Sequence, residues 1–69
     1  MSLPIELEQE EDGRWVAEIP DLPGVMAYGP SRDEAADAAR ALALRVLADR
    51  LEHGEEVPDA VADLFAVRV

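Results

Sequence analysis

Apolar and polar residues alternate near the start of this chain. Ile5 and Leu7 are separated by Glu6 and Glu8, and Glu10 continues the acidic positions. Successive side chains of a β-strand point to opposite faces, so an alternation with a period of two is typical of a strand. The pattern predicts a first strand over residues 4–10, with one apolar face and one acidic face.

A second alternation follows a short turn. Trp15, Ala17 and Ile19 alternate with Val16 and Glu18, which predicts a half-buried strand. Trp15 is the only tryptophan of the chain, and we expect it on the apolar side. A further apolar run, residues 25–28, predicts a third strand that stops at Gly29.

The length of the first turn decides which residues face each other. A two-residue turn would mix acidic and apolar positions on each face. A three-residue loop, residues 11–13, pairs Leu7 with Ala17 and Ile5 with Ile19, so that one face is apolar throughout. Hairpins of this kind commonly end on a residue in the left-handed conformation, and Gly13 occupies that place.

The periodicity then changes to that of a helix. Ser31 and Glu34 fit a capping box at the start of an alanine-rich run, so we expect a helix over residues 32–52. One stripe should pack on the sheet: Ala35, Ala39, Leu42 and Val46. A second apolar stripe lies on the opposite side: Leu44, Leu47 and Leu51. We expect Val61, Leu64 or Phe65 to cover part of it, and self-association to cover the rest.

The C-terminal residues predict a short helical turn and a last strand. Residues 59–64 suit the turn, and Phe65, Val67 and Val69 alternate with Ala66 and Arg68. The expected fold class is α+β: a three-stranded antiparallel meander, a right-handed crossover helix and a fourth strand beside the first. This βββαβ sheet, with the order 3-2-1-4, resembles a partial ribonuclease-H-like fold. We expect residues 1–69 to form a single domain.

The charge is strongly acidic. The 69 residues include 16 acids and six bases, for a formal charge of −10. Such a chain disfavours direct nucleic-acid binding and attracts basic partners; alternatively, the acids only keep a small protein in solution. The register above also sets Glu6 opposite Glu18. Either water screens these charges, or the face binds a cation or a basic partner. The candidate partner surface is Glu6, Glu8 and Glu10.

The chain offers little catalytic chemistry. It has one histidine, His53, no cysteine and few hydroxyl side chains, and Ser31 and His53 lie at opposite ends of the expected helix. We expect no catalytic, metal or cofactor site, although clustered carboxylates leave a weak hydrolase as an alternative. The sequence shows no leader peptide and no apolar run long enough to cross a bilayer, so we expect a cytoplasmic protein without membrane contact.

A proline-rich corner, Pro20-Asp-Leu-Pro-Gly24, links the second and third expected strands. Asp12-Gly13 precedes Trp15, and the corner is followed by Tyr28-Gly29 and by Ser31-x-x-Glu34. In this order the elements resemble the HicB-like antitoxin domain. The resemblance spans roughly residues 5–58, and it implies structural roles for Gly13, Trp15, Pro20, Asp21, Leu22, Pro23, Gly24, Gly29, Ser31 and Glu34.

The resemblance also implies a function. HicB-like antitoxins neutralise a small, basic HicA toxin, which is an mRNA-cleaving ribonuclease with a catalytic histidine. They typically carry a DNA-binding element after this domain, and we expect none in this chain. The expectation is a non-enzymatic, protein-binding module that forms a homodimer or a higher homo-oligomer. The alternative is a homo-oligomeric module without a toxin partner.

Overall fold

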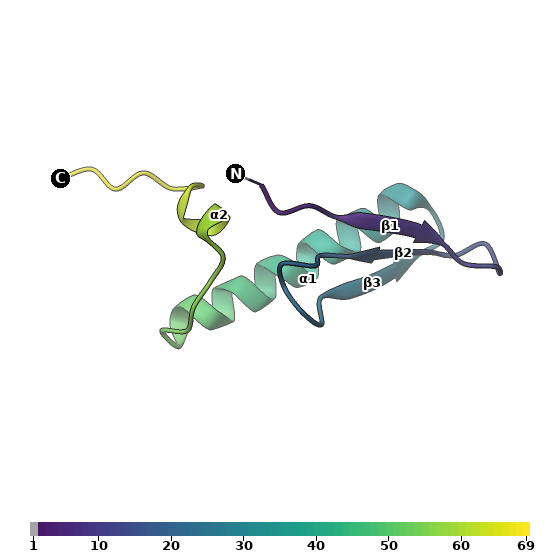
Figure 1. Ribbon diagram of the computed structural model, residues 1–69, viewed down its shortest axis with the longest axis horizontal. Coiled ribbons are helices and arrows are strands. Elements are labelled where there is room, and N and C mark those ends of the chain that lie inside the picture. The colour runs from purple at the N-terminus through teal and green to yellow at the C-terminus, as the bar shows by residue number, and fades with distance from the viewer. Residues whose placement is uncertain (1) are drawn as a thin grey trace.

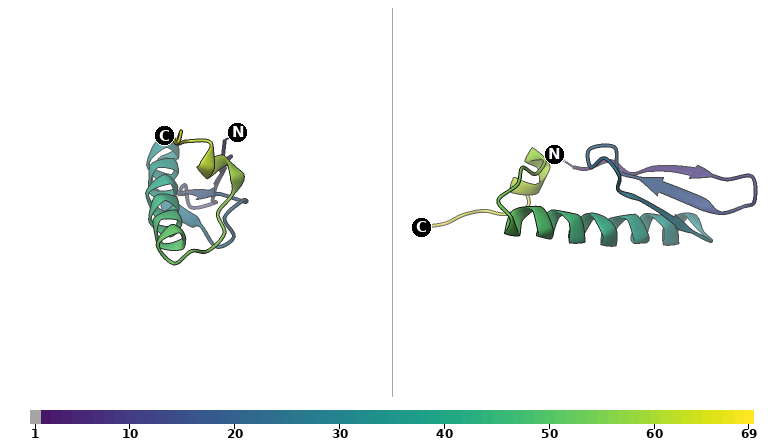
Figure 2. Two further views of the ribbon diagram at one scale, coloured as in Figure 1. Left: turned by 90° about the vertical axis from the view of Figure 1, so that its left-hand side faces the viewer. Right: turned by 90° about the horizontal axis from the view of Figure 1, so that it is seen from below.

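The computed structural model describes residues 2–69 and shows an α+β fold (Figure 1). Three short strands are followed by one long helix and one short helix. Their bounds are β1 Glu6–Gln9, β2 Trp15–Glu18, β3 Met26–Gly29, α1 Arg32–Glu52 and α2 Asp59–Ala62. The strands form one antiparallel sheet of order β1-β2-β3, and α1 lies along one face of it (Figure 2).

The first hairpin has the three-residue loop that the facing of the side chains predicted. Leu7 lies opposite Ala17, and Glu6 opposite Glu18. The Glu10 N–H donates to the Arg14 carbonyl at 2.7 Å, and the Gly13 N–H donates to the Glu10 carbonyl at 3.0 Å. Gly13 has a φ of 92°, a conformation that glycine adopts without steric cost. The predicted register and the predicted role of Gly13 are confirmed.

The proline-rich corner turns tightly and packs against the core. The Leu22 N–H donates to the Ile19 carbonyl and the Val25 N–H to the Leu22 carbonyl, both at 2.9 Å, and the Ile19 N–H donates to the Val25 carbonyl at 3.1 Å. These bonds turn the chain tightly, with Gly24 at a φ of 89°. Leu22 and Val25 are the largest fully buried side chains, so the corner supplies core residues as well as a turn.

Helix α1 begins with the predicted cap and ends near His53. Ser31 has an extended backbone, and its Oγ accepts a hydrogen bond from the Glu34 N–H at 3.1 Å. This bond satisfies one of the N–H groups that lack a partner in the first turn of a helix. At the other end, Gly54 follows with a φ of 69°, which is typical of the residue just after a helix.

The face of α1 that packs on the sheet is wider than predicted. Ala35 and Ala39 are buried as expected, and Leu42 and Val46 are half-buried against the core. Leu47 was assigned to the opposite stripe, and this was wrong: it is 6% exposed and belongs to the core. The row from Ala39 through Ala43 to Leu47 advances four residues at a time and therefore forms one continuous ridge.

Gly29 allows α1 to start directly against β3. A Cβ placed on Gly29 would lie 2.5 Å from the Ala35 nitrogen and 2.9 Å from both the Ala35 Cα and the Glu34 carbonyl carbon. All three are backbone atoms, which cannot rotate away as a flexible side chain could. Glycine is therefore required at this position for close packing.

The expected fourth strand does not form. Within residues 2–69 the sheet has three strands, and residues 65–69 have no regular secondary structure. The short helix was predicted correctly: α2 places Val61 in the core. Leu64 and Phe65, however, are 67% and 72% exposed and do not cover α1. The Leu64 N–H donates to Val61 and the Phe65 N–H to Ala62, both at 3.2 Å, and these bonds carry the chain away from the sheet (Figure 1).

Candidate functional site

The face of the sheet opposite α1 carries the acidic side chains of the first strand. Strand alternation sends Glu6 and Glu8 to this side, and the register places Val16 and Glu18 of β2 beside them. Met26 and Tyr28 of β3 complete the rows, because Met26 lies opposite Glu18 and Tyr28 opposite Val16. We call this surface the outer sheet face, and define it by Glu6, Glu8, Glu10, Val16, Glu18, Met26 and Tyr28.

The outer sheet face is shallow and open. Its side chains surround a depression of about 530 Å³. Met26 and Tyr28 are both 46% exposed, and Val16 is half-buried between the neighbouring strands. Apolar side chains thus lie on β3 and at Val16 of β2, while carboxylates follow β1 and continue to Glu18 of β2. Exposed methionine and aromatic side chains are typical of protein–protein interfaces.

The charges on this face are largely unneutralised. Among residues 2–69, no ion pair involves Glu6, Glu8 or Glu18. Like charges directly across a strand pair repel, so the facing of Glu6 and Glu18 is a local cost. A basic group on this face would remove that cost.

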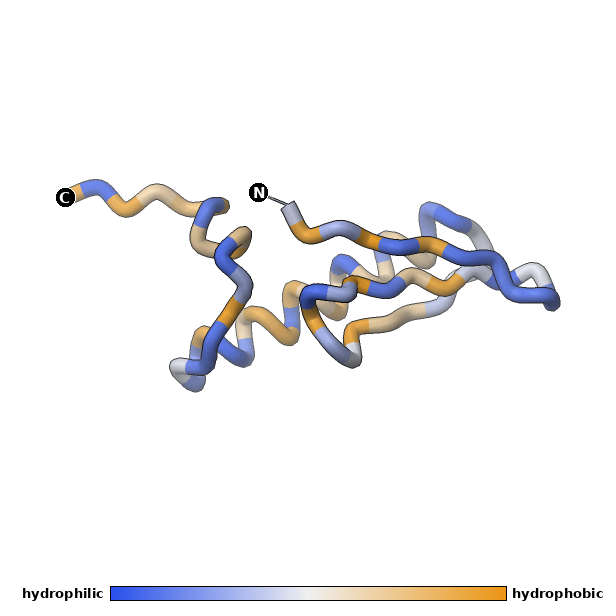
Figure 3. Tube along the Cα trace, viewed as in Figure 1, coloured by the Kyte–Doolittle hydropathy of each residue, from blue (hydrophilic) through white to orange (hydrophobic). Residues whose placement is uncertain are grey.

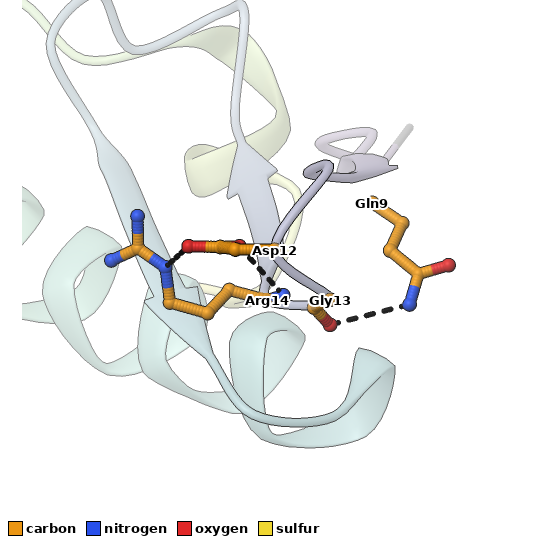
Figure 4. Close-up of polar contacts among 4 residues, drawn as sticks. All are labelled: Gln9, Asp12, Gly13 and Arg14. Carbon is orange, nitrogen blue, oxygen red and sulfur yellow. Dashed lines mark hydrogen bonds and ion pairs between the residues drawn. The ribbon is translucent and has the colours of Figure 1, made fainter.

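Arg14 lies beside this face and is already engaged at the hairpin tip (Figure 4). Arg14 Nε donates to Asp12 Oδ2 at 2.8 Å, and the Arg14 N–H donates to Asp12 Oδ1 at 3.0 Å. The backbone bond, together with the guanidinium, holds the pKa of Asp12 below its usual value. The guanidinium carbon also lies 4.9 Å from the centre of the Tyr28 ring, a cation–π contact. Gln9 Nε2 donates to the Gly13 carbonyl at 3.2 Å.

The chemistry of the described residues suits binding through surface contacts. In residues 2–69 there is no group of three His, Asp or Glu side chains placed to hold a metal ion. His53 Nδ1 lies 2.8 Å from the carbonyl oxygen of Asp49 at the end of α1, far along the helix from Ser31 (Figure 1). The outer sheet face offers carboxylate acceptors and about half-exposed apolar area, which together match a basic protein surface.

The predicted surface residues separate into three groups. Glu6, Glu8 and Glu10 are brought together on the outer sheet face, as alternation predicted. Leu44 and Leu51 are 64% and 55% exposed on α1, away from that face. Leu47, the third member of the expected leucine stripe, belongs to the core.

Sequence reasoning missed the apolar part of the outer sheet face. Met26 and Tyr28 were assigned to a third strand without a facing. Their signal was present, because Met26 and Tyr28 alternate with Val25, which is 2% exposed, and with Ala27. Extending the register argument from the first hairpin to β3 would have placed both on the side of Glu18 and Val16.

The fold and this surface define a small α+β domain with an open, acidic sheet face. A comparison with protein families matches residues 3–67 to the HicB-like antitoxin of bacterial toxin–antitoxin systems. The chain belongs to this family, which confirms the resemblance seen in the sequence. Comparisons with curated proteins and with solved structures give no match. In residues 2–69 no helix is both long and apolar enough to cross a membrane.

Proposed function

We propose that this chain is a non-enzymatic, cytoplasmic antitoxin that neutralises a small, basic ribonuclease toxin of the HicA type. The outer sheet face would cover the RNA-binding and catalytic surface of the toxin. This chain belongs to an antitoxin family, and one face of its sheet combines unneutralised carboxylates with exposed apolar side chains. That combination is the observation that carries the proposal.

The two halves of the outer sheet face have different physical roles. The carboxylates of Glu6, Glu8 and Glu10 raise the encounter rate with a basic toxin, because opposite charges attract over about the Debye length, roughly 8 Å at physiological salt. The apolar groups of Met26 and Tyr28 hold the complex once it has formed, since the dissociation rate depends mainly on buried contacts. The same basic toxin surface would relieve the repulsion between Glu6 and Glu18.

The first experiment is co-expression with a neighbouring reading frame that encodes a short, basic protein. We expect this chain to restore growth and to co-purify with that protein. Failure of both would contradict the proposal. With purified proteins, association is followed by stopped-flow or surface plasmon resonance at rising salt, and we expect the association rate to fall steeply while the dissociation rate changes little.

A charge-matched pair of variants tests the outer sheet face itself. Glu6→Gln, Glu8→Gln and Glu10→Gln together remove three charges from the face. The control removes the same charges by the same substitution at exposed positions near the end of α1: Glu52→Gln, Glu55→Gln and Glu56→Gln. We expect the first variant to associate more slowly than the control. Equal rates would show that only the net charge matters, and would exclude the outer sheet face as the docking surface.

The role of the apolar side chains of the outer sheet face is tested through the lifetime of the complex. Tyr28→Ala should raise the dissociation rate, because the ring presents a large, partly exposed apolar area on this face. Leu44→Ala is the control, because Leu44 is also exposed but lies on α1.

We expect neither variant to bind operator DNA at physiological salt, since a chain with a charge of −10 gains nothing from counterion release.

A second candidate function is favoured by one observation. Exposed apolar side chains continue beyond α2, at Leu64, Phe65 and Val67, and a small domain gains stability when such groups are buried by association. A homo-oligomeric module without a toxin would use these groups alone. It is distinguished by the absence of a basic partner in the co-expression experiment.

A further inference from the structure

Residues 65–69 have the pattern of a strand but no strand to pair with. Phe65 and Val67 are 72% and 92% exposed, and they alternate with Ala66 and Arg68. The segment extends beyond the body of the protein, and its hydrophobic stretch is interrupted by a hydrophilic position close to the C-terminus (Figures 1 and 3). Isolated in water, such a segment leaves both its apolar side chains and its backbone groups exposed.

Strand β1 has a free edge. The sheet order places β1 at one side, and within residues 2–69 its only neighbouring strand is β2. The Glu10 N–H donates to the carbonyl of Arg14, the residue before β2, and hydrogen-bonded and non-hydrogen-bonded residue pairs alternate along an antiparallel pair of strands. The N–H and C=O groups of Leu7 and Gln9 therefore point away from β2, toward the free edge. An edge of this kind is a template for a further strand.

We propose that residues 65–69 of one copy of this chain pair with the β1 edge of a second copy, and that the exchange is reciprocal. The pairing supplies a fourth strand to each sheet, in the place beside β1, but from the partner. The proposal does not rest on toxin binding, because the edge of β1 and the outer sheet face are different surfaces of the same sheet.

The side chains of the segment match both faces of the sheet. With Phe65 and Val67 on the side of α1, they extend the apolar face that Leu7 contributes from β1. Arg68 then lies on the outer side, where the carboxylates of β1 have no basic partner among residues 2–69. A base inserted beside Glu6 and Glu8 neutralises part of this acidic row, and opposite charges on neighbouring strands are favourable.

The direction of the segment favours a second copy over the same chain. Val61 anchors α2 in the core, and the Leu64 and Phe65 N–H groups bond back to α2. The chain therefore leaves α2 away from its own β1 (Figures 1 and 2), and a return would require reversal at residues 63–65. A neighbouring copy needs no reversal. A reciprocal exchange about a two-fold axis occupies both edges and closes the dimer, whereas a one-way exchange would extend into a filament.

The first test measures the size of the protein by sedimentation velocity over a range of protein concentrations. It compares variants on the two sides of the alternating segment. We expect a species of about 15 kDa, twice the 7.5 kDa of the chain. Val67→Arg places a charge on the apolar side and should abolish this dimer. Ala66→Arg introduces the same residue one position earlier, on the acidic side, and should keep or strengthen it. Circular dichroism checks that both variants remain folded, since both positions are exposed in the monomer.

The outcomes of the first test separate the possibilities. A wild-type chain that is monomeric at every concentration overturns the proposal. Loss of the dimer in both variants shows nonspecific contact and also overturns it. If both variants keep the dimer, the dimer forms elsewhere, for example through Leu44 and Leu51 on α1. This result also overturns the proposal.

The second test identifies the edge and the partner by disulfide trapping, which is clean because the chain has no cysteine. Ala66→Cys protein is mixed with Glu8→Cys protein in a thiol redox buffer, with Ala66→Cys plus Asp21→Cys as the control. We expect the mixed disulfide between positions 66 and 8 to exceed the control by mass spectrometry. No excess overturns the proposal.

The double variant, carrying Ala66→Cys and Glu8→Cys in one chain, decides between the two sources of the fourth strand. We expect it to form a doubly linked dimer. Closure within a 7.5 kDa monomer would show that the segment pairs with its own β1 and would overturn the exchange. The two proposals can fail separately. A dimer that forms without any toxin does not contradict the antitoxin function, and toxin binding by the monomeric Val67→Arg variant does not contradict the strand exchange.

Discussion

Two glycines of this domain should respond very differently to the same substitution. Gly13 has a φ of 92° and nothing within 4 Å of the position where a Cβ would stand. Gly29 does not have a positive φ, but a Cβ there would lie 2.5 Å from the Ala35 nitrogen. Alanine at Gly13 therefore tests the backbone conformation, and alanine at Gly29 tests the close approach of β3 to α1.

The magnitudes follow from the two causes. Alanine in the left-handed conformation costs about 1–2 kcal/mol. Insertion of a methyl group into a packed site costs typically about 1–3 kcal/mol and occasionally more. Gly29 belongs at the upper end, because the three nearest atoms are all backbone atoms of α1 and the whole first turn would have to move. Total stability for a chain of this length is about 3–10 kcal/mol, so Gly29→Ala removes a large part of it.

Thermal and urea unfolding measure both effects. A loss of 1 kcal/mol lowers the Tm of a small domain by about 4–8 °C. We expect Gly13→Ala to lower it by one to two such steps, and Gly29→Ala by about three or to prevent folding. Gly13→Asn separates the causes further, since asparagine tolerates positive φ and should recover part of the loss, while Gly29→Asn should be worse than Gly29→Ala. A Gly29→Ala protein that is more stable than Gly13→Ala would refute the argument from close packing.

Three further predictions concern single contacts. Ser31→Ala should lower the free energy of unfolding by about 1 kcal/mol, because the cap to the Glu34 N–H is lost; a change below the error of urea titration would count against it. Leu47→Ala should cost about 2–5 kcal/mol as a core truncation, whereas the same change at exposed Leu44 should stay within about 0.5 kcal/mol, and equal losses would contradict the burial. Asp12 should titrate below 3.8 by NMR, and, because its pKa is lowered on folding, its contribution to stability is present above that value and is lost as the pH falls through the folded pKa. Part of this lowering of the Asp12 pKa should survive in Arg14→Ala, since the largest cause is the backbone N–H, and full return to the ordinary value would disprove that cause.

The local elements could be predicted because each depends on few neighbours. The facing of Leu7 and Ala17 selected the three-residue loop, since any other register would have exposed apolar side chains and buried acids. That loop then required a left-handed residue, which is Gly13. The cap at Ser31 depends only on the residues of the first helical turn, and for that reason its sequence signal was sufficient.

The candidate site was predicted only in part. Alternation along β1 was enough to group Glu6 with its acidic neighbours on one face. The apolar part of this face could be placed only from the pairing of β3 with β2, because the facing of Met26 and Tyr28 depends on how the proline-rich corner connects the strands. The burial of Leu22 has the same origin: a turn residue reaches the core only if the turn folds over the open end of the sheet.

By itself the sequence determined the strand alternation, the first hairpin, the helix with its cap, and the membership of the HicB-like antitoxin family. Each of these depends on periodicity or on residues close together in the chain. The tertiary structure decided the facing of α1 and the course of residues 65–69. Leu47 belongs to the core because the small side chains of the Ala39–Ala43 ridge let α1 lie close to the sheet. A periodicity of 3.6 residues cannot show how wide the buried face of a helix is. Residues 65–69 have the pattern of a strand, but a strand needs a partner edge, and the anchoring of Val61 directs the segment away from β1 of its own chain.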